Sequence, residues 1–275
     1  MIKEVLLETI KIISIVAVLM TVVEWLEIRF EKKIKRFLTK SVRTQIIGAS
    51  LLGTVPGCLD AFLVVSLYSH GLVGFGALVA VMLSTAGDEA FLMLTMVPKK
   101  AFLIFALCAI LGAVGGFLAK IFAQKIGFKR AKVCPIKIHK ERLESKHFIK
   151  EHLFAHIIKV HIPRLFLWIF GTLLLVNLLM KHLNLARVLP QNKLFLILLA
   201  GLVGIIPESG PHLIFLTLYS KGVIPFSVLL VSSLSQDGHG LLPLLSYSFS
   251  DTFWVQIFTT LFSLGVGLVL FLMGV

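Results

Sequence analysis

Acidic and imidazole side chains occur in this sequence beside glycine and proline, inside segments that are otherwise apolar. They fall in four short strings at residues 53–60, 86–89, 204–212 and 237–240. The seven candidate ligands are Asp60, Asp88, Glu89, Glu208, His212, Asp237 and His239. Carboxylate oxygens with one or two imidazoles favour a cation, and Mn²⁺ suits them best, followed by Zn²⁺ and Fe²⁺. These residue types therefore predict a divalent-metal site.

The surrounding residues favour this interpretation over two simpler ones. A carboxylate inside a membrane costs at least about 2.5 kcal/mol, so carboxylates without a function tend to be absent there. These groups could instead cap free backbone amides or lie near the membrane surface, and those alternatives stay open. An anion carrier would need arginines, and residues 46–97 and 194–250 contain none, with Lys221 as their sole lysine.

Composition indicates an integral membrane protein. Of the 275 residues 57% are hydrophobic, and the mean hydropathy is +0.97, far above a soluble domain. The net charge of +13 is concentrated, with 7 of the 27 Lys and Arg residues in 29–43 and 12 in 120–164. Such basic segments are typical of cytoplasmic loops rather than of nucleic-acid binding. Three scattered cysteines, Cys58, Cys108 and Cys134, indicate neither disulfides nor a thiolate metal site.

The two halves of the chain repeat each other at an offset of 151 residues. Between residues 46–94 and 197–245, 15 of 49 ungapped pairs are identical. The identities include Pro56 with Pro207 and Gly87 with Gly238. Internal repeats are common in transporters, so a duplication explains the pattern better than chance matching of leucines.

The repeat predicts an all-α membrane protein with two inverted structural repeats, whose broken or re-entrant helices meet at the bilayer midplane. We expect repeats at 1–124 and 158–275, joined by a basic, His-containing cytoplasmic linker at 125–157. In each half, two interrupted segments (44–69 and 72–97; 194–220 and 223–247) lie between spanning helices (8–28 and 101–124; 158–181 and 253–275). Pro56 and Pro207 should each end a half-helix. Ser209 is the expected N-cap of the next helix, with Pro211 near its first position.

Four motifs in these strings resemble the signature segments of a known family. The motifs are Pro56-Gly-Cys58, Ser84-Thr-Ala-Gly-Asp-Glu-Ala-Phe91, Ile206-Pro-Glu-Ser-Gly-Pro-His-Leu-Ile-Phe215 and Ser235-Gln-Asp-Gly-His-Gly240. The sequence is similar here to the ten-transmembrane heavy-metal exporter family, whose members are labelled arsenic efflux proteins or manganese transporters. The resemblance implies a multi-pass metal exporter of the prokaryotic plasma membrane, with the charged motif positions as ligands.

We therefore expect a secondary transporter that exports a divalent metal, with Mn²⁺ favoured, and not an enzyme. No cofactor is expected besides the transported metal, and the expected partners are membrane lipid and a counter-transported proton or ion. No GxxxxGK[ST] loop occurs, so a gradient would have to drive transport. Alternatives are an arsenic exporter, an intramembrane enzyme of the polyprenyl diphosphate phosphatase type, an aspartyl protease and a channel. The linker histidines could collect metal, or the linker could lie on anionic lipid.

Overall fold

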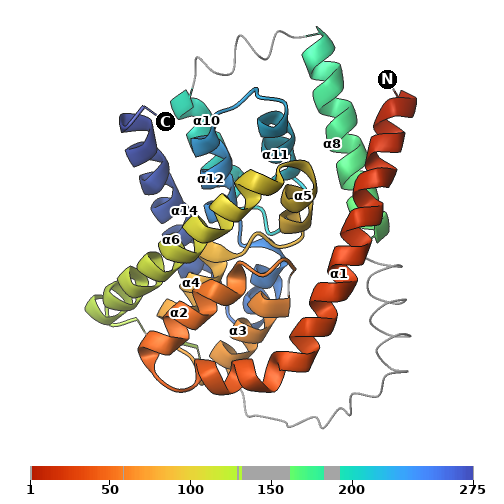
Figure 1. The fold of residues 1–275 in the computed structure, drawn as a ribbon. Coiled ribbons are helices and arrows are strands. Elements are labelled where there is room, and N and C mark those ends of the chain that lie inside the picture. Colours follow the sequence, from red (N-terminus) through yellow and green to blue (C-terminus); the bar gives the residue numbers. More distant parts are fainter. Residues whose placement is uncertain (1, 58, 129, 132–161, 183–192, 275) are drawn as a thin grey trace.

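The computed structural model describes residues 2–57, 59–128, 130–131, 162–182 and 193–274. Within these ranges the secondary structure is helical, without a strand. The first half contains α1 (Ile2–Leu38), α2 (Val42–Gly53), α3 (Leu59–Ser69), α4 (Phe75–Ser84), α5 (Glu89–Met96) and α6 (Pro98–Lys125). The second contains α8 (Ile162–His182), α10 (Lys193–Val203), α11 (Leu213–Ser220), α12 (Phe226–Ser235), η3 (Gly238–Gly240), α13 (Leu241–Tyr247) and α14 (Phe249–Leu272). The predicted all-α class is confirmed (Figure 1).

The helices recur at the offset found in the sequence. α10, α12 and α14 each start 151 residues after α2, α4 and α6, and α4 and α12 have the same length of 10 residues. Backbone geometry at the second interruption recurs too. Thr85 and Gln236 are both extended, and the φ angles of Gly87 and Gly238 are 50° and 53°. Only glycine adopts this left-handed conformation without strain, so both interruptions need it.

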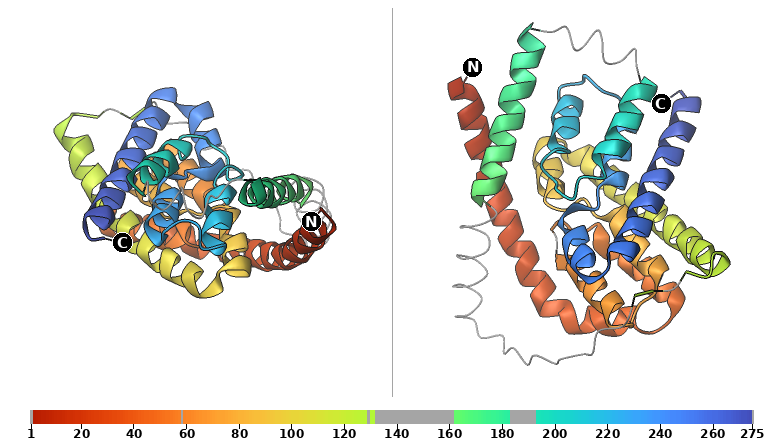
Figure 2. Two further views of the ribbon diagram at one scale, coloured as in Figure 1. Left: turned by 90° about the horizontal axis from the view of Figure 1, so that it is seen from above. Right: turned by 180° about the vertical axis from the view of Figure 1, so that it is seen from behind.

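Packing follows the same correspondence. α2 packs against α4 and α6 in the first half, and α10 packs against α12 and α14 in the second. The halves join through α4 with α14, α6 with α12, α3 with α13, and α5 with α11. α1 and α8 lie side by side to one side of the bundle (Figure 2). α1 descends from the N-terminus in Figure 1, whereas α8 rises beside it, so these two helices run in opposite directions.

The outer surface of the bundle suits lipid. Phe102, Leu167 and Leu272 are 68%, 70% and 75% exposed, which water would disfavour but hydrocarbon accepts. Three helical stretches among the described residues are long and apolar enough to span a membrane, namely Phe75–Met96, Pro98–Lys125 and Phe249–Leu272. The chain is therefore a membrane protein with several apolar helices.

The end of α1, the start of α2 and the end of α6, which include or adjoin the described residues of 29–43 and 120–131, lie at one end of the molecule (Figure 1). α1 ends there, and Val42, which follows it, lines the same cavity as Lys120 of α6. That these segments share one side of the membrane stays a prediction. Most of the 125–157 linker, including its histidines, lies outside the described residues.

The helices break where the prolines predict, but the helix after the break at Pro207 starts later than predicted. α2 ends at Gly53 and α10 at Val203, shortly before Pro56 and Pro207. The predicted N-cap at Ser209 is wrong, because α11 starts at Leu213 with His212 in the N-cap position. The N–H of Leu213 donates to the carbonyl of Gly210 at 3.1 Å. Short three-residue hydrogen-bonded turns therefore precede the helix and delay its start.

Candidate metal-binding site at the helix breaks

The interruptions of the four broken helices lie against one another. The N–H of Gly57 donates to the carbonyl of Gly87 at 3.3 Å, which joins the two breaks of the first half. A methyl group added at Gly87 would lie 3.0 Å from Ser209 Oγ, and one at Gly238 would lie 3.7 Å from the same atom. Ser209 thus lies beside the glycine turns of both halves, and the interruptions form one central region.

Glycine allows the helix ends in this region to pack closely. A Cβ at Gly53 would meet Ser84 and would lie 2.8 Å from the carbonyl oxygen of Val81. The equivalent Gly204 lies against Ser235, whose carbonyl oxygen would be 2.7 Å from an added Cβ. Both contacts involve backbone atoms, which cannot rotate away. In each half, the end of the first broken helix is therefore held against the end of the second.

A buried hydrogen bond joins the two halves at the breaks. Gln236 Nε2 donates to Glu89 Oε2 at 2.7 Å and also lies 3.4 Å from the carbonyl oxygen of Ala86. Both Glu89 and Gln236 are fully buried. A donor to a buried carboxylate offsets part of its lost hydration. This bond also fixes the second break of one half to the second break of the other.

The second half adds two further buried groups. Thr259 of α14 donates to Asp237 Oδ2 at 3.3 Å. His212 Nδ1 lies 2.9 Å from the hydroxyl oxygen of Ser232 on α12. Asp237 is 1% exposed and His212 is fully buried. Each side chain is therefore held by one polar neighbour through one atom, which leaves its other polar atom for a ligand.

Several buried polar atoms at the breaks have no hydrogen-bond partner among the described residues. These atoms are Glu89 Oε1, Gln236 Oε1, Asp237 Oδ1, Ser209 Oγ and His212 Nε2. Buried polar groups are usually hydrogen-bonded, so each exception calls for an explanation. Four of the five are oxygens and the fifth is an imidazole nitrogen, and such atoms can coordinate a cation.

The remaining predicted ligands lie in or beside the same breaks. Asp60 is in the first turn of α3 and Asp88 immediately precedes α5, and each is 3% exposed. Glu208 is half-buried in the link between α10 and α11. The start of α3 reaches η3, because a Cβ at Gly240 would lie 2.6 Å from Ala61 Cβ. His239 belongs to η3, but its side chain is outside the described part of the structure.

The predicted ligands share this region without forming one cluster of charged ligands. Among the described side chains, no three His, Cys, Asp or Glu residues converge closely enough to hold a metal. The metal-ligand role of the seven residues therefore stays a prediction. The sequence did not predict two buried contacts at the breaks. Gln236 donates to Glu89, and Thr259 donates to Asp237. Gln236 could have been noticed as an amide within an apolar segment, beside Asp237, whereas Thr259 gave no distinct signal.

Comparison with known families places the chain in one of them. The family model described as "Putative, 10TM heavy-metal exporter" matches residues 8–182 and 165–274, which is nearly the whole chain. The chain belongs to the ten-transmembrane heavy-metal exporter family. The resemblance carried by the motifs at the breaks is thereby confirmed. Neither a curated protein nor a solved structure matches the chain.

Proposed function

We propose that this family member is a secondary transporter that exports a divalent metal cation, with Mn²⁺ favoured, through the region where the helix breaks meet. One observation carries the proposal. Buried oxygens and an imidazole nitrogen at the breaks have no hydrogen-bond partner among the described residues. Uncompensated buried polar groups are costly, and a cation that binds them would offset that cost.

The donor set favours a hard or borderline ion. Carboxylate, amide and hydroxyl oxygens suit Mn²⁺, while a single imidazole leaves room for Zn²⁺ or Fe²⁺. Soft metals prefer several thiolates. Cys108 is buried on α6 and is the one cysteine whose side chain the structure describes. This chemistry supports manganese over arsenic compounds as the exported substrate.

We further propose that the two halves are inverted repeats that provide alternating access. The opposite directions of α1 and α8 and the reciprocal contacts between the halves support this arrangement. In such transporters one bundle rocks against the other around a fixed central site. The predicted carboxylates do not form a three-ligand cluster in the described conformation. We therefore expect the carboxylates to converge in another conformation of the transport cycle. The broken helices of each half would then act as re-entrant half-helices on either side of the site.

Energy for export would come from an ion or proton gradient across the plasma membrane of a prokaryote. The sequence has no nucleotide-binding loop of the GxxxxGK[ST] type. Buried Glu89, Asp237 and His212 can each hold a proton or a metal, so exchange of one for the other would couple the two gradients. Metal transport in proteoliposomes that ignores an imposed pH gradient would contradict this coupling.

Two matched substitutions test the site. Asp237 and Asp251 are both 1% exposed, but only Asp237 lies at a break. Asp237→Asn keeps an acceptor for Thr259, and Asp251→Asn keeps an acceptor for the hydroxyl of Tyr68, now 2.8 Å from the carboxylate. Each variant therefore removes a charge and retains a hydrogen bond.

The assay is metal content and growth of cells with and without the protein under Mn²⁺, Zn²⁺, Fe²⁺ or arsenite stress. Wild type and Asp251→Asn should lower cellular manganese and protect growth, while Asp237→Asn should do neither at equal expression. Full protection by Asp237→Asn would remove this residue from the site. If the protein protects cells against arsenite alone, the substrate is an arsenic compound and not manganese.

A further inference from the structure

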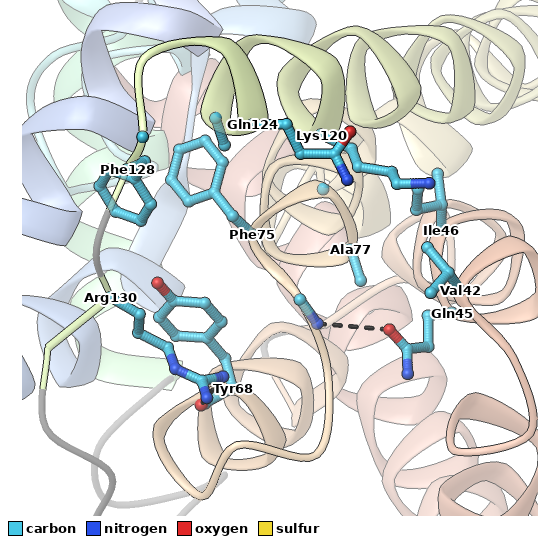
Figure 3. A pocket seen from close by; sticks show the side chains of 14 residues that line it. Val42, Gln45, Ile46, Tyr68, Phe75, Ala77, Lys120, Gln124, Phe128 and Arg130 are labelled. Carbon is cyan, nitrogen blue, oxygen red and sulfur yellow. Dashed lines mark hydrogen bonds between the residues drawn. The ribbon is translucent and has the colours of Figure 1, made fainter.

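A second candidate site lies at the end of the molecule where the basic segments meet. It is a cavity of about 540 Å³ between α2, α3, α4, α6 and the residues after α6 (Figure 3). Its walls include Ile46, Tyr68, Phe75, Lys120, Phe128 and Arg130. Val42 begins the 12-residue α2 and Gly53 ends it at a break. At 1.5 Å per residue, Val42 at the cavity lies roughly 16 Å along α2 from the break at Gly53.

The charge of the cavity is positive. Lys120 and Arg130 line it, and none of the described lining residues is acidic. No ion pair or hydrogen bond of the Lys120 ammonium occurs within the described part of the chain. The carboxylate of Asp251, beside Tyr68, already accepts from the hydroxyl of Tyr68 at 2.8 Å and from the N–H of Ala131 at 3.4 Å. The cavity therefore favours an anionic ligand.

Arg130 is held in position for such a ligand. One guanidinium nitrogen, Nη1, donates to the carbonyl oxygens of Val73 at 3.2 Å and Tyr68 at 3.4 Å. The guanidinium carbon lies 5.3 Å from the centre of the Tyr68 ring, and Figure 3 shows the two side chains together. Arginine has five N–H donors in a fixed fork. The other nitrogens can therefore bind two oxygens of one phosphate group, the geometry that arginine prefers.

The remaining walls of the cavity are apolar. Ile46, Phe75 and Phe128 line it, and the rings of Phe75 and Phe128 are 4.7 Å apart. Exposed apolar side chains also occur on α2 and directly after α6, where Ile47 and Ile126 are 45% and 46% exposed. An anion with attached hydrocarbon fits this combination, since the charged group would meet the cations and the chains would follow the apolar helices.

We propose that this cavity binds the phosphate group of an anionic membrane phospholipid, with Arg130 as the phosphate-binding residue and Lys120, on the opposite wall (Figure 3), adding positive charge. Basic pockets between membrane helices on the cytoplasmic side bind lipid headgroups of this kind. Arg130 also contacts Tyr68, whose hydroxyl bonds to Asp251 of α14. A bound lipid therefore stabilises the contact between the first half and α14. This site is independent of the metal proposal.

Thermal unfolding of purified, delipidated protein in detergent tests the proposal. The additions are a phosphatidylglycerol, a phosphatidylcholine with the same acyl chains, and inorganic phosphate. The unfolding midpoint should rise with phosphatidylglycerol and stay unchanged with phosphatidylcholine. An equal rise with inorganic phosphate at the same concentration would overturn the lipid assignment in favour of a free anion.

Three substitutions locate the effect. Lys120→Gln and Arg130→Gln should each weaken the apparent affinity for phosphatidylglycerol at least about fivefold, the contribution of one cation beside anionic lipid. Lys125→Gln is the matched control, because Lys125 is an exposed lysine of the same helix that does not line the cavity. If Arg130→Gln fails to fold, Lys120→Gln decides alone. Wild-type affinity in Lys120→Gln, or an equal loss in Lys125→Gln, would overturn the proposal.

Discussion

Replacing Gly53 or Gly204 by alanine should destabilise the protein, although alanine usually stabilises a helix. The added Cβ at Gly53 would lie 2.8 Å from the carbonyl oxygen of Val81 and closer still to Ser84. At Gly204 it would lie 2.5 Å from Ser235 Cβ and 2.7 Å from the Ser235 carbonyl oxygen. Backbone atoms must shift to relieve these contacts, and overpacking of this kind costs about 1–3 kcal/mol.

The opposing effect is smaller. Alanine gains roughly 0.5–1 kcal/mol over glycine within a helix, and less at a helix end, so the net loss should be about 1–2 kcal/mol. For a chain of this size that corresponds to a fall of roughly 2–8 °C in the unfolding midpoint. Both variants should show it to a similar extent, because the two glycines hold equivalent helix ends together.

Gly171→Ala and Gly265→Ala are the controls. A Cβ at either position meets nothing within 4 Å, and both glycines are helical and exposed. Their unfolding midpoints should be unchanged or slightly higher. All five proteins are compared in one detergent at one scan rate, since unfolding of membrane proteins is often irreversible. If Gly204→Ala is as stable as Gly265→Ala, the close approach of the helix ends at the second-half break is refuted.

Three further outcomes follow from the same contacts. Gln236→Leu removes the donor 2.7 Å from the buried Glu89 carboxylate, and should cost about 1–3 kcal/mol in stability, measured by thermal unfolding at pH 7. Tyr68→Phe removes the hydroxyl that donates to Asp251 and should also cost about 1–3 kcal/mol in stability. Manganese export, measured as metal content of cells, should not change. Isothermal titration should find that one Mn²⁺ binds per chain. Both Glu89→Gln and Asp237→Asn should abolish this binding. Binding of two ions per chain would contradict a shared site.

The positions of the helix breaks could be predicted because local chemistry decides them. Pro56 and Pro207 lack a backbone donor and clash with the preceding turn, so a helix does not continue through them. Gly87 and Gly238 permit a left-handed turn that other residues resist. The start of α11 could not be placed in the same way. Ser209 has the residue type of an N-cap, but its hydroxyl lies beside the glycine turns of both halves, a position that only tertiary packing determines.

The contacts between the halves lie beyond sequence reasoning for a related reason. Glu89 and Gln236 are 147 residues apart in the chain, and nothing local in either segment indicates the pairing. The cavity with Lys120 and Arg130 could not be predicted for a different reason. Both residues belong to a basic segment whose charge predicts membrane orientation. A specific role emerges only when Tyr68 of α3 is seen beside Arg130.

The repeat conserves the backbone of the breaks but not their chemistry, and this difference supports one shared site. Gly87 and Gly238 occupy equivalent positions with nearly equal φ angles. At the offset of 151, however, Glu89 corresponds to Gly240, and Asp237 corresponds to Ala86. Each half therefore contributes a carboxylate where the other half has none. Two complete sites would need the same ligands in both halves, so complementary ligands from two similar scaffolds favour a single ion held between them.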